Sequence, residues 1–306
     1  MSESGSLFTV TDLDIDIPLG MHLIASLNGF TDAGSTISQV SDNIFANFEH
    51  HLLVEFNNDE LLDYRARRPI MYFEKDHIAD YEPATLGIFL VYDEARQPFL
   101  FLHGYEPDFR WESFIDALLT IIDLFGVSQI SWVHSIPFPI PHTRPIGVTV
   151  SGNRRDLIDS TSEWKPQTQV PGNVLHLLEY RGSSSGLPMV GFVLLVPHYL
   201  GDSEYPVAGV KALELLSLGT GLVFSTDALR EESITFLAKL TEQLEDNDEL
   251  KRMVANLEQG YTSERTTPGR PNISKPETKM PTAEEIAAEL EDYLASRRRN
   301  QTDEEN

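Results

Sequence analysis

The stretch from residue 130 to residue 152 constrains this chain more than any other part of it. It enters as an apolar run, passes through a loop dense in proline, and leaves as a second run rich in β-branched residues. A short apolar run bounded by turn residues is typical of a buried central strand. Loops at the ends of such strands carry the sites of many α/β proteins. This loop holds His134, His142 and Arg144, which are therefore candidate functional residues.

Strand and helix patterns alternate on the N-terminal side of this stretch. Residues 21–27 form a strand pattern, and an amphipathic helical pattern follows a short turn. Residues 107–125 predict a second amphipathic helix that ends at a glycine. Two strand patterns at residues 86–92 and 99–102 are close enough for a hairpin, so the sheet should be mixed. The chain therefore predicts an α/β fold with three αβα layers and a mixed sheet.

Further elements are expected on the C-terminal side. Residues 174–179 and 189–196 are predicted strands, joined by a polar turn at residues 181–186. That turn matches the G-x-S-x-G pattern of a nucleophile elbow, but an elbow needs a helix after the turn and a strand follows here. Residues 207–218 predict a helix, with Gly219 as the residue just past its end.

The composition changes near residue 226, and this defines the expected domains. Helical patterns follow that point, and a stretch rich in Pro, Thr, Ser and Lys then precedes a last helix that begins near Thr282. We expect an α/β domain over residues 1–225 and a helical C-terminal region over residues 226–306. A flexible linker is expected near residues 260–281.

Composition excludes several classes of function. A formal net charge of −25 argues against binding to nucleic acid or to an anionic membrane surface. The absence of cysteine excludes disulfides, thiolate catalysis and cysteine-ligated zinc. No apolar run reaches the roughly 18 residues of a membrane span, and we expect no secretory signal. We therefore expect a cytoplasmic protein that binds neither nucleic acid nor membrane, without a metal or cofactor.

The turn at residues 28–34 is the first candidate site. Backbone N–H groups at a helix N-terminus can hold an anion. The turn has no basic residue, however, and Asp32 would repel phosphate. It also matches neither a P-loop nor a dinucleotide-binding motif. This segment can therefore be interpreted as a tight structural turn or as a small-ligand site.

Two further groups of residues can each be interpreted in more than one way. His142 and Arg144 could bind an anion or supply a base, or they could be structural, as could His198. The spacing of the histidines matches no metal motif. The basic cluster of Arg65, Arg67 and Arg68 could clamp phosphate, or it could pair with nearby carboxylates. Those carboxylates are Asp59, Glu60 and Asp63.

Four segments in this order resemble the PAC2 family, the proteasome assembly chaperone 2-like proteins. They are residues 28–34, 59–69, 141–145 and 197–199. With its helical C-terminal extension, the chain looks like the actinobacterial branch. The resemblance implies a phosphorylase/hydrolase-like fold similar to purine nucleoside phosphorylase. It also implies oligomers and, in some members, chaperoning of proteasome α-subunits, but no established catalysis.

The sequence thus favours a non-enzymatic oligomeric scaffold or assembly-chaperone-like protein, with a possible protein client. We favour a homotrimer, because phosphorylase-like folds often assemble that way. The alternative is a nucleoside- or glycosyl-transferring enzyme, or a small-anion-binding module of the same fold. No catalytic residue is assigned. The candidate ligand-binding or interface residues are Asn28, Gly29, Asp32, Gly34, Arg67, Arg68, His142, Arg144, His198 and Tyr199.

Overall fold

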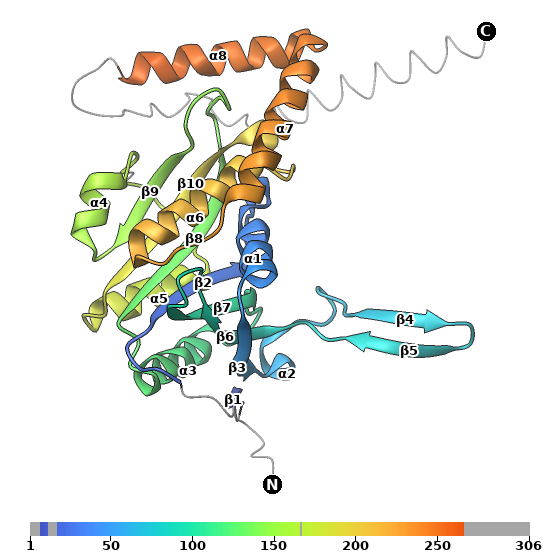
Figure 1. The fold of residues 1–306 in the computed structure, drawn as a ribbon, viewed down its shortest axis with the longest axis vertical. Coiled ribbons are helices and arrows are strands. Elements are labelled where there is room, and N and C mark those ends of the chain that lie inside the picture. The colour runs from blue at the N-terminus through green and yellow to red at the C-terminus, as the bar shows by residue number, and fades with distance from the viewer. Residues whose placement is uncertain (1–6, 12–16, 166, 266–306) are drawn as a thin grey trace, which may run out of the picture. The chain divides into compact units, whose positions relative to one another are not determined.

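The computed structural model describes residues 7–11, 17–165 and 167–265 (Figure 1). The chain divides into two compact units, Met1–Gln259 and Gly260–Asn306. The expected boundary between residues 225 and 226 stays a prediction. Most of the expected linker and the last helix, from Thr282, lie outside the described residues.

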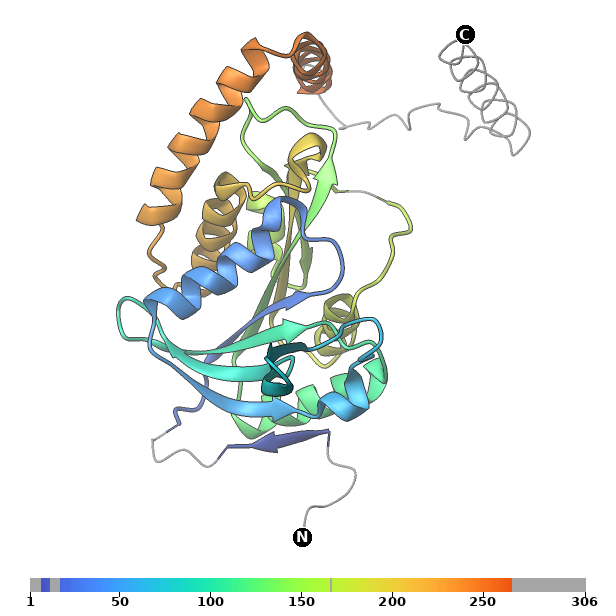
Figure 2. The same cartoon turned by 90° about the vertical axis from the view of Figure 1, so that its right-hand side faces the viewer.

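A mixed sheet of eight strands forms the centre of the first unit (Figures 1 and 2). The strand order is β1-β3-β6-β7-β2-β8-β10-β9. Strands β7, β2, β8 and β10 are parallel to one another, and the remaining pairs are antiparallel. The predicted mixed α/β class is therefore confirmed. The strands are β1 (Phe8–Val10), β2 (His22–Asn28), β3 (His50–Phe56), β6 (Leu86–Tyr92), β7 (Pro98–Tyr105), β8 (Gln129–Phe138), β9 (Gly147–Gly152) and β10 (Met189–Pro197).

Helices pack on both faces of this sheet and give the three predicted layers (Figure 2). Apolar residues of α1, α6 and α7 fill the core on one face, and those of α3 and α5 fill the core on the other. The helices are α1 (Thr36–Asn47), α2 (Asn58–Leu61), α3 (Trp111–Leu124), α4 (Arg155–Thr161), α5 (Val174–Ser184), α6 (Pro206–Thr220), α7 (Asp227–Glu245) and α8 (Asp248–Arg265). Two short 3₁₀ turns are η1 (Ala33–Ser35) and η2 (His198–Leu200).

The Asp32 side chain caps the start of helix α1 from the turn that precedes it. The Asp32 carboxylate accepts hydrogen bonds from the backbone N–H of Ile37 at 2.7 Å and of Ser38 at 3.2 Å. These bonds satisfy N–H groups that have no partner within the first turn of a helix. Gly34 adopts a φ of 72°, which favours glycine, as the chain turns into the helix.

The predicted strand at residues 174–179 is wrong, because this segment is the first half of helix α5. Asn173 accepts from the backbone N–H of His176, and the His176 ring accepts from the backbone N–H of Asn173. This reciprocal pair starts a helix, whereas a short apolar run alone does not distinguish helix from strand. The polar segment 181–186 is therefore the end of a helix rather than a hairpin turn.

Helix α6 runs two residues further than predicted. Gly221, with a φ of 78°, follows its last residue in place of Gly219. Gly219 lies inside the helix, where an added Cβ would come within 3.1 Å of the Phe192 ring. Close packing against the sheet, rather than helix termination, therefore accounts for Gly219.

A separate two-stranded hairpin was not predicted. Strands β4 (Ile70–Glu74) and β5 (His77–Glu82) pair only with each other and project away from the main sheet (Figure 1). Every residue of both strands is exposed. Because these apolar residues are exposed, they do not form the periodic pattern of a strand with one buried face. Sequence periodicity alone therefore did not predict this hairpin.

We predict that Gly191→Ala destabilises the fold by about 1–3 kcal/mol or more, because the core cannot accept the extra carbon. The added Cβ would lie 2.2 Å from Cε2 of the fully buried Trp132 indole. Urea unfolding measures the change. The control is Gly172→Ala, where a Cβ meets nothing within 4 Å. Equal stabilities of the two variants would contradict this packing.

Candidate functional site

The carboxyl ends of β2, β7, β8 and β10 lie along one edge of the sheet, because these four strands are parallel. We call this the carboxyl edge. The loop after β2, the residues after β7, the end of β8 and the turn η2 after β10 all meet there. Gly34 N donates to Gly201 O at 2.8 Å, which joins the loop after β2 to the chain after β10. Most of the predicted site residues fall on this edge.

The loop at residues 28–34 is fastened to the end of β8. Thr31 Oγ1 donates to the Ser135 carbonyl at 3.1 Å and lies 3.1 Å from His134 Nε2. A hydroxyl has one proton to donate, so His134 Nε2 carries the hydrogen in this pair. The Phe30 ring stacks on His134 at 5.1 Å, and Ser135 Oγ donates to Asp32. The loop is therefore a well-anchored turn.

Arg67 lies against the same loop, but its guanidinium is already paired. It donates to the Glu106 carbonyl at 2.8 Å and lies 3.1 Å from Asp108 Oδ1. A Cβ at Gly29 would approach Arg67 Nη2 to 2.7 Å, so only glycine leaves room for this contact. The predicted pairing of the basic cluster with Asp59, Glu60 and Asp63 is therefore wrong for Arg67.

The other members of the basic cluster lie apart from this pair. Arg65 and Arg68 are exposed. Glu60, one of the expected partners, instead pairs with Arg110 from the loop before α3. Among the described residues, no ion pair joins this cluster to Asp59, Glu60 or Asp63, because residues 57–69 fold back against the segment after β7, where Asp63 N donates to Asp108.

His142 and Tyr199 form a second contact at the carboxyl edge. The Tyr199 hydroxyl accepts from the backbone N–H of His142 at 2.7 Å and lies 2.6 Å from its Nδ1. Burial raises the pKa of Tyr199 and lowers the pKa of His142, and the Glu258 carboxylate partly opposes the shift at His142. Arg144 and His198 are exposed beside this pair. The contact orders the proline-rich loop and brings no cation to the loop at residues 28–34.

A polar cluster that the sequence analysis missed lies beneath β8. Trp132 Nε1 donates to Glu179 Oε2 at 2.9 Å, and Ser151 Oγ donates to the same oxygen at 2.8 Å. The Trp132 ring also meets His176 edge-on at 5.2 Å. In a helix, residues three apart share a face, whereas in the predicted strand His176 and Glu179 would point to opposite faces. The wrong element type therefore concealed this cluster.

Burial perturbs the ionisable groups of this region. Burial, with a smaller contribution from His176, lowers the pKa of His134 to about 4. Burial also lowers the pKa of His176 and raises that of Glu179, although the hydrogen bonds from Ser151 and Trp132 oppose the rise. It raises the pKa of Glu106, which accepts from the Val174 N–H at 2.7 Å. Shifted groups gathered at a strand edge are typical of ligand sites, and also of buried structural networks.

The structure thus brings together only some of the predicted site residues. Asn28 O accepts from Glu106 N at 2.6 Å, so the loop residues and Arg67 share one neighbourhood. His142 and Tyr199 form another neighbourhood, and Arg68, Arg144 and His198 remain on the surface. In the part of the chain that the structure describes, no three potential metal ligands come together. None of the described helices is long and apolar enough to cross a membrane.

Comparisons with known proteins identify one family and several similar structures. The PAC2 family model matches residues 26–244. A Corynebacterium glutamicum protein of unknown function is 33% identical, with a TM-score of 0.81, covering 85% of this chain and 98% of that one. A Mycobacterium tuberculosis protein of unknown function is 35% identical, with a TM-score of 0.80, covering 86% and 94%.

A more distant likeness concerns the fold alone. A proteasome-assembly chaperone homologue from M. tuberculosis is 21% identical, with a TM-score of 0.70, covering 76% of this chain and 100% of that one. The comparison with curated proteins gives no match.

We predict that His134 makes stability fall as the pH drops. Its pKa is about 4 in the fold and about 6.5 unfolded, so the unfolded chain binds the proton first. The stability is present above the unfolded value and is lost as the pH falls toward 4. Between about pH 7 and pH 5, wild type should lose about 2 kcal/mol more than His134→Gln.

Urea unfolding at the two pH values measures this difference. Glutamine at position 134 can still donate to Thr31 but does not titrate, so the comparison isolates the protonation of His134. Equal losses of stability in wild type and variant would show that folding does not lower the pKa of His134.

Proposed function

Because the chain belongs to the PAC2 family, we propose that it is a non-enzymatic, oligomeric protein with an assembly-chaperone-like role. The exposed apolar face of the β4–β5 hairpin carries this proposal. The fold-level likeness to a proteasome-assembly chaperone homologue supports a protein client. We also propose that the protein acts in the cytoplasm, in keeping with its charge and its lack of cysteine.

The hairpin separates apolar from acidic residues. Met71 lies opposite Tyr81, and Phe73 lies opposite Ile78. Directly opposed residues point to the same face, so these four side chains form one apolar face. Their exposed fractions range from 45% to 61%. We call this the apolar hairpin face.

The other face of the hairpin is mixed in character. It carries Ile70 and Tyr72 beside Asp80 and Glu82. Such a face can remain in water, whereas the apolar hairpin face gains from being covered. The two faces of the hairpin therefore differ. The apolar hairpin face is suited to a partner, and the mixed face is suited to solvent.

An isolated two-stranded hairpin is at best marginally stable in water. No residue from 70 to 82 belongs to either hydrophobic core of the first unit, and the four side chains of the apolar hairpin face are largely exposed. Every copy of the chain carries the same face, so a second copy can cover it without any other partner. We propose that the hairpin of one copy packs on the next and that the assembly is a homotrimer.

One observation favours a second function. Beneath β8, burial shifts the pKa values of His176 and Glu179, and it also shifts the pKa of His134 on the same strand. Such clusters occur where small ligands bind. A ligand-binding module, or an enzyme of the phosphorylase-like fold, would use this cluster. A phosphate clamp formed by the basic cluster is less suitable, because Arg67 already pairs with Asp108.

We predict that Phe73→Ser/Ile78→Ser converts the oligomer to monomers, because it replaces apolar contact area with hydroxyl groups. Native mass spectrometry across micromolar concentrations would report the number of copies. It would also report any small molecule retained on the protein, which would favour the second function.

The matched control is Ile70→Ser/Tyr72→Ser, which makes a similar change on the mixed face of the same hairpin. It should leave the oligomer intact. A monomeric wild type, or equal dissociation of both double variants, would rule out the apolar hairpin face as the contact between copies.

A further inference from the structure

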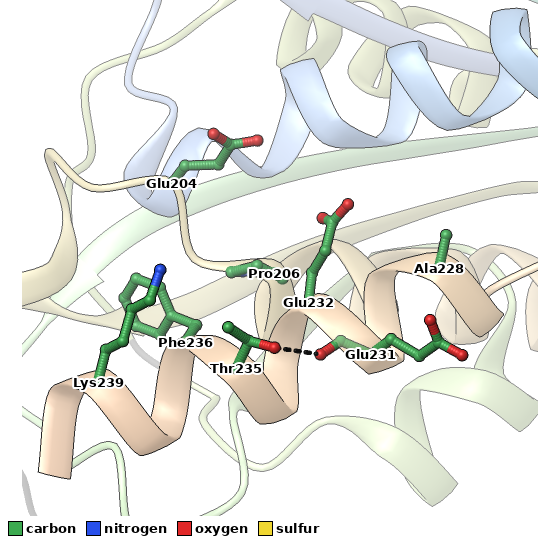
Figure 3. A pocket seen from close by; sticks show the side chains of 8 residues that line it. All are labelled: Glu204, Pro206, Ala228, Glu231, Glu232, Thr235, Phe236 and Lys239. Atoms are coloured by element: carbon green, nitrogen blue, oxygen red, sulfur yellow. Dashed lines mark hydrogen bonds between the residues drawn. The ribbon is translucent and has the colours of Figure 1, made fainter.

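A hollow of about 590 Å³ lies between α7 and the loop that precedes α6 (Figure 3). Glu231, Glu232, Phe236 and Lys239 line it from α7, and Glu204 lines it from the loop. Glu232 and Lys239 point from α7 toward the loop that carries Glu204 (Figure 3). This volume suits a small molecule or a few side chains of a partner. The hollow contains none of the candidate residues of the carboxyl edge.

The carboxylates around the hollow form no ion pair within the described part of the chain. Glu204, Glu231 and Glu232 are exposed, and none of them is among the ion pairs of the described residues. Arg230, their neighbour in sequence, pairs with Glu214 instead. Lys239 is exposed in the same way. Carboxylates outnumber the ammonium group in the lining by two, so the hollow attracts cations and repels anions.

An aromatic ring forms part of the same hollow. Phe236 is half-buried and packs on the buried Tyr205 ring at 5.5 Å, which holds it in place. Pro206 adds a second apolar surface. An aromatic face attracts a cation, and an apolar surface holds the alkyl stem of a long basic side chain.

The lining distinguishes between two kinds of cation. A metal ion needs several ligand atoms that converge on one point. No three potential metal ligands converge in the part of the chain described here. A guanidinium or ammonium group on an alkyl stem needs only carboxylates at one end and apolar contact along its length. The residues present fit the second kind.

We propose that this hollow binds an arginine or lysine side chain of a protein partner. Glu204 and Glu232 hold the cation from opposite walls, and the alkyl stem lies on Phe236 and Pro206. The net charge of −25 on the whole chain draws basic partners toward it, and the hollow then selects among them. This site is independent of the proposed contact between copies, since it uses no hairpin residue.

The test uses the full-length protein and two fluorescein-labelled peptides, one alternating arginine with glycine and one alternating glutamate with glycine. Fluorescence anisotropy at fixed ionic strength measures the binding of each. The arginine peptide should bind, and the glutamate peptide should not. Glu204→Gln/Glu232→Gln should weaken binding of the arginine peptide about fivefold or more, because both carboxylates contact its cation.

Lys239 allows a variant that should strengthen binding rather than weaken it. Lys239→Gln removes a positive charge from the lining, so it should tighten binding of the arginine peptide. Tightening cannot result from a misfolded variant, which protects the test against loss of structure. Weaker binding by this variant would overturn the proposal.

The matched control is Glu242→Gln/Glu245→Gln, which removes the same charge from exposed positions of α7 outside the hollow. It should change binding by less than twofold. Equal weakening by both double variants would mean that only the general negative charge attracts the peptide, and the proposal would be wrong. Failure of wild type to bind the arginine peptide would also overturn it.

Discussion

The parallel alignment of β7, β2, β8 and β10 is the constraint on which the rest of the structure depends. Parallel strands point their carboxyl ends to one edge, so four loops from distant parts of the sequence must share that edge. Helices then have to return the chain along both faces, which produces the three layers. The carboxyl edge, the cluster beneath β8 and the contact between His142 and Tyr199 all follow from this one alignment.

Close packing keeps these strands in place. The indole of Trp132 occupies the space above Gly191 on the adjacent strand, where any side chain would collide with it. The same indole reaches Glu179 of α5 through its N–H. One buried residue therefore packs across two neighbouring strands and also holds the helix that covers them. This is why a polar cluster can persist inside an otherwise apolar layer.

Much of the fold was predictable, because long periodic segments and hydrophobic runs carry strong signals. The stretch from residue 130 to residue 152 forms β8 and β9, and the helical pattern after the turn at residues 28–34 forms α1. The failures have two causes. The start of α5 was predicted as a strand because a short apolar run does not distinguish helix from strand, although Asn173 and His176 cap the helix locally. Arg67 pairs with Asp108, forty-one residues away, and local sequence does not reveal such a tertiary partner.

The separation of the β4–β5 hairpin from both cores affects how the sequence can evolve. Since residues 70–82 contribute nothing to either core, substitutions there alter what the surface contacts without loosening the sheet. The proposed contact between copies and the stability of the sheet are therefore encoded in separate parts of the chain. Related chains could therefore differ in how their copies assemble while keeping one scaffold, because substitutions in the hairpin and in the core act independently.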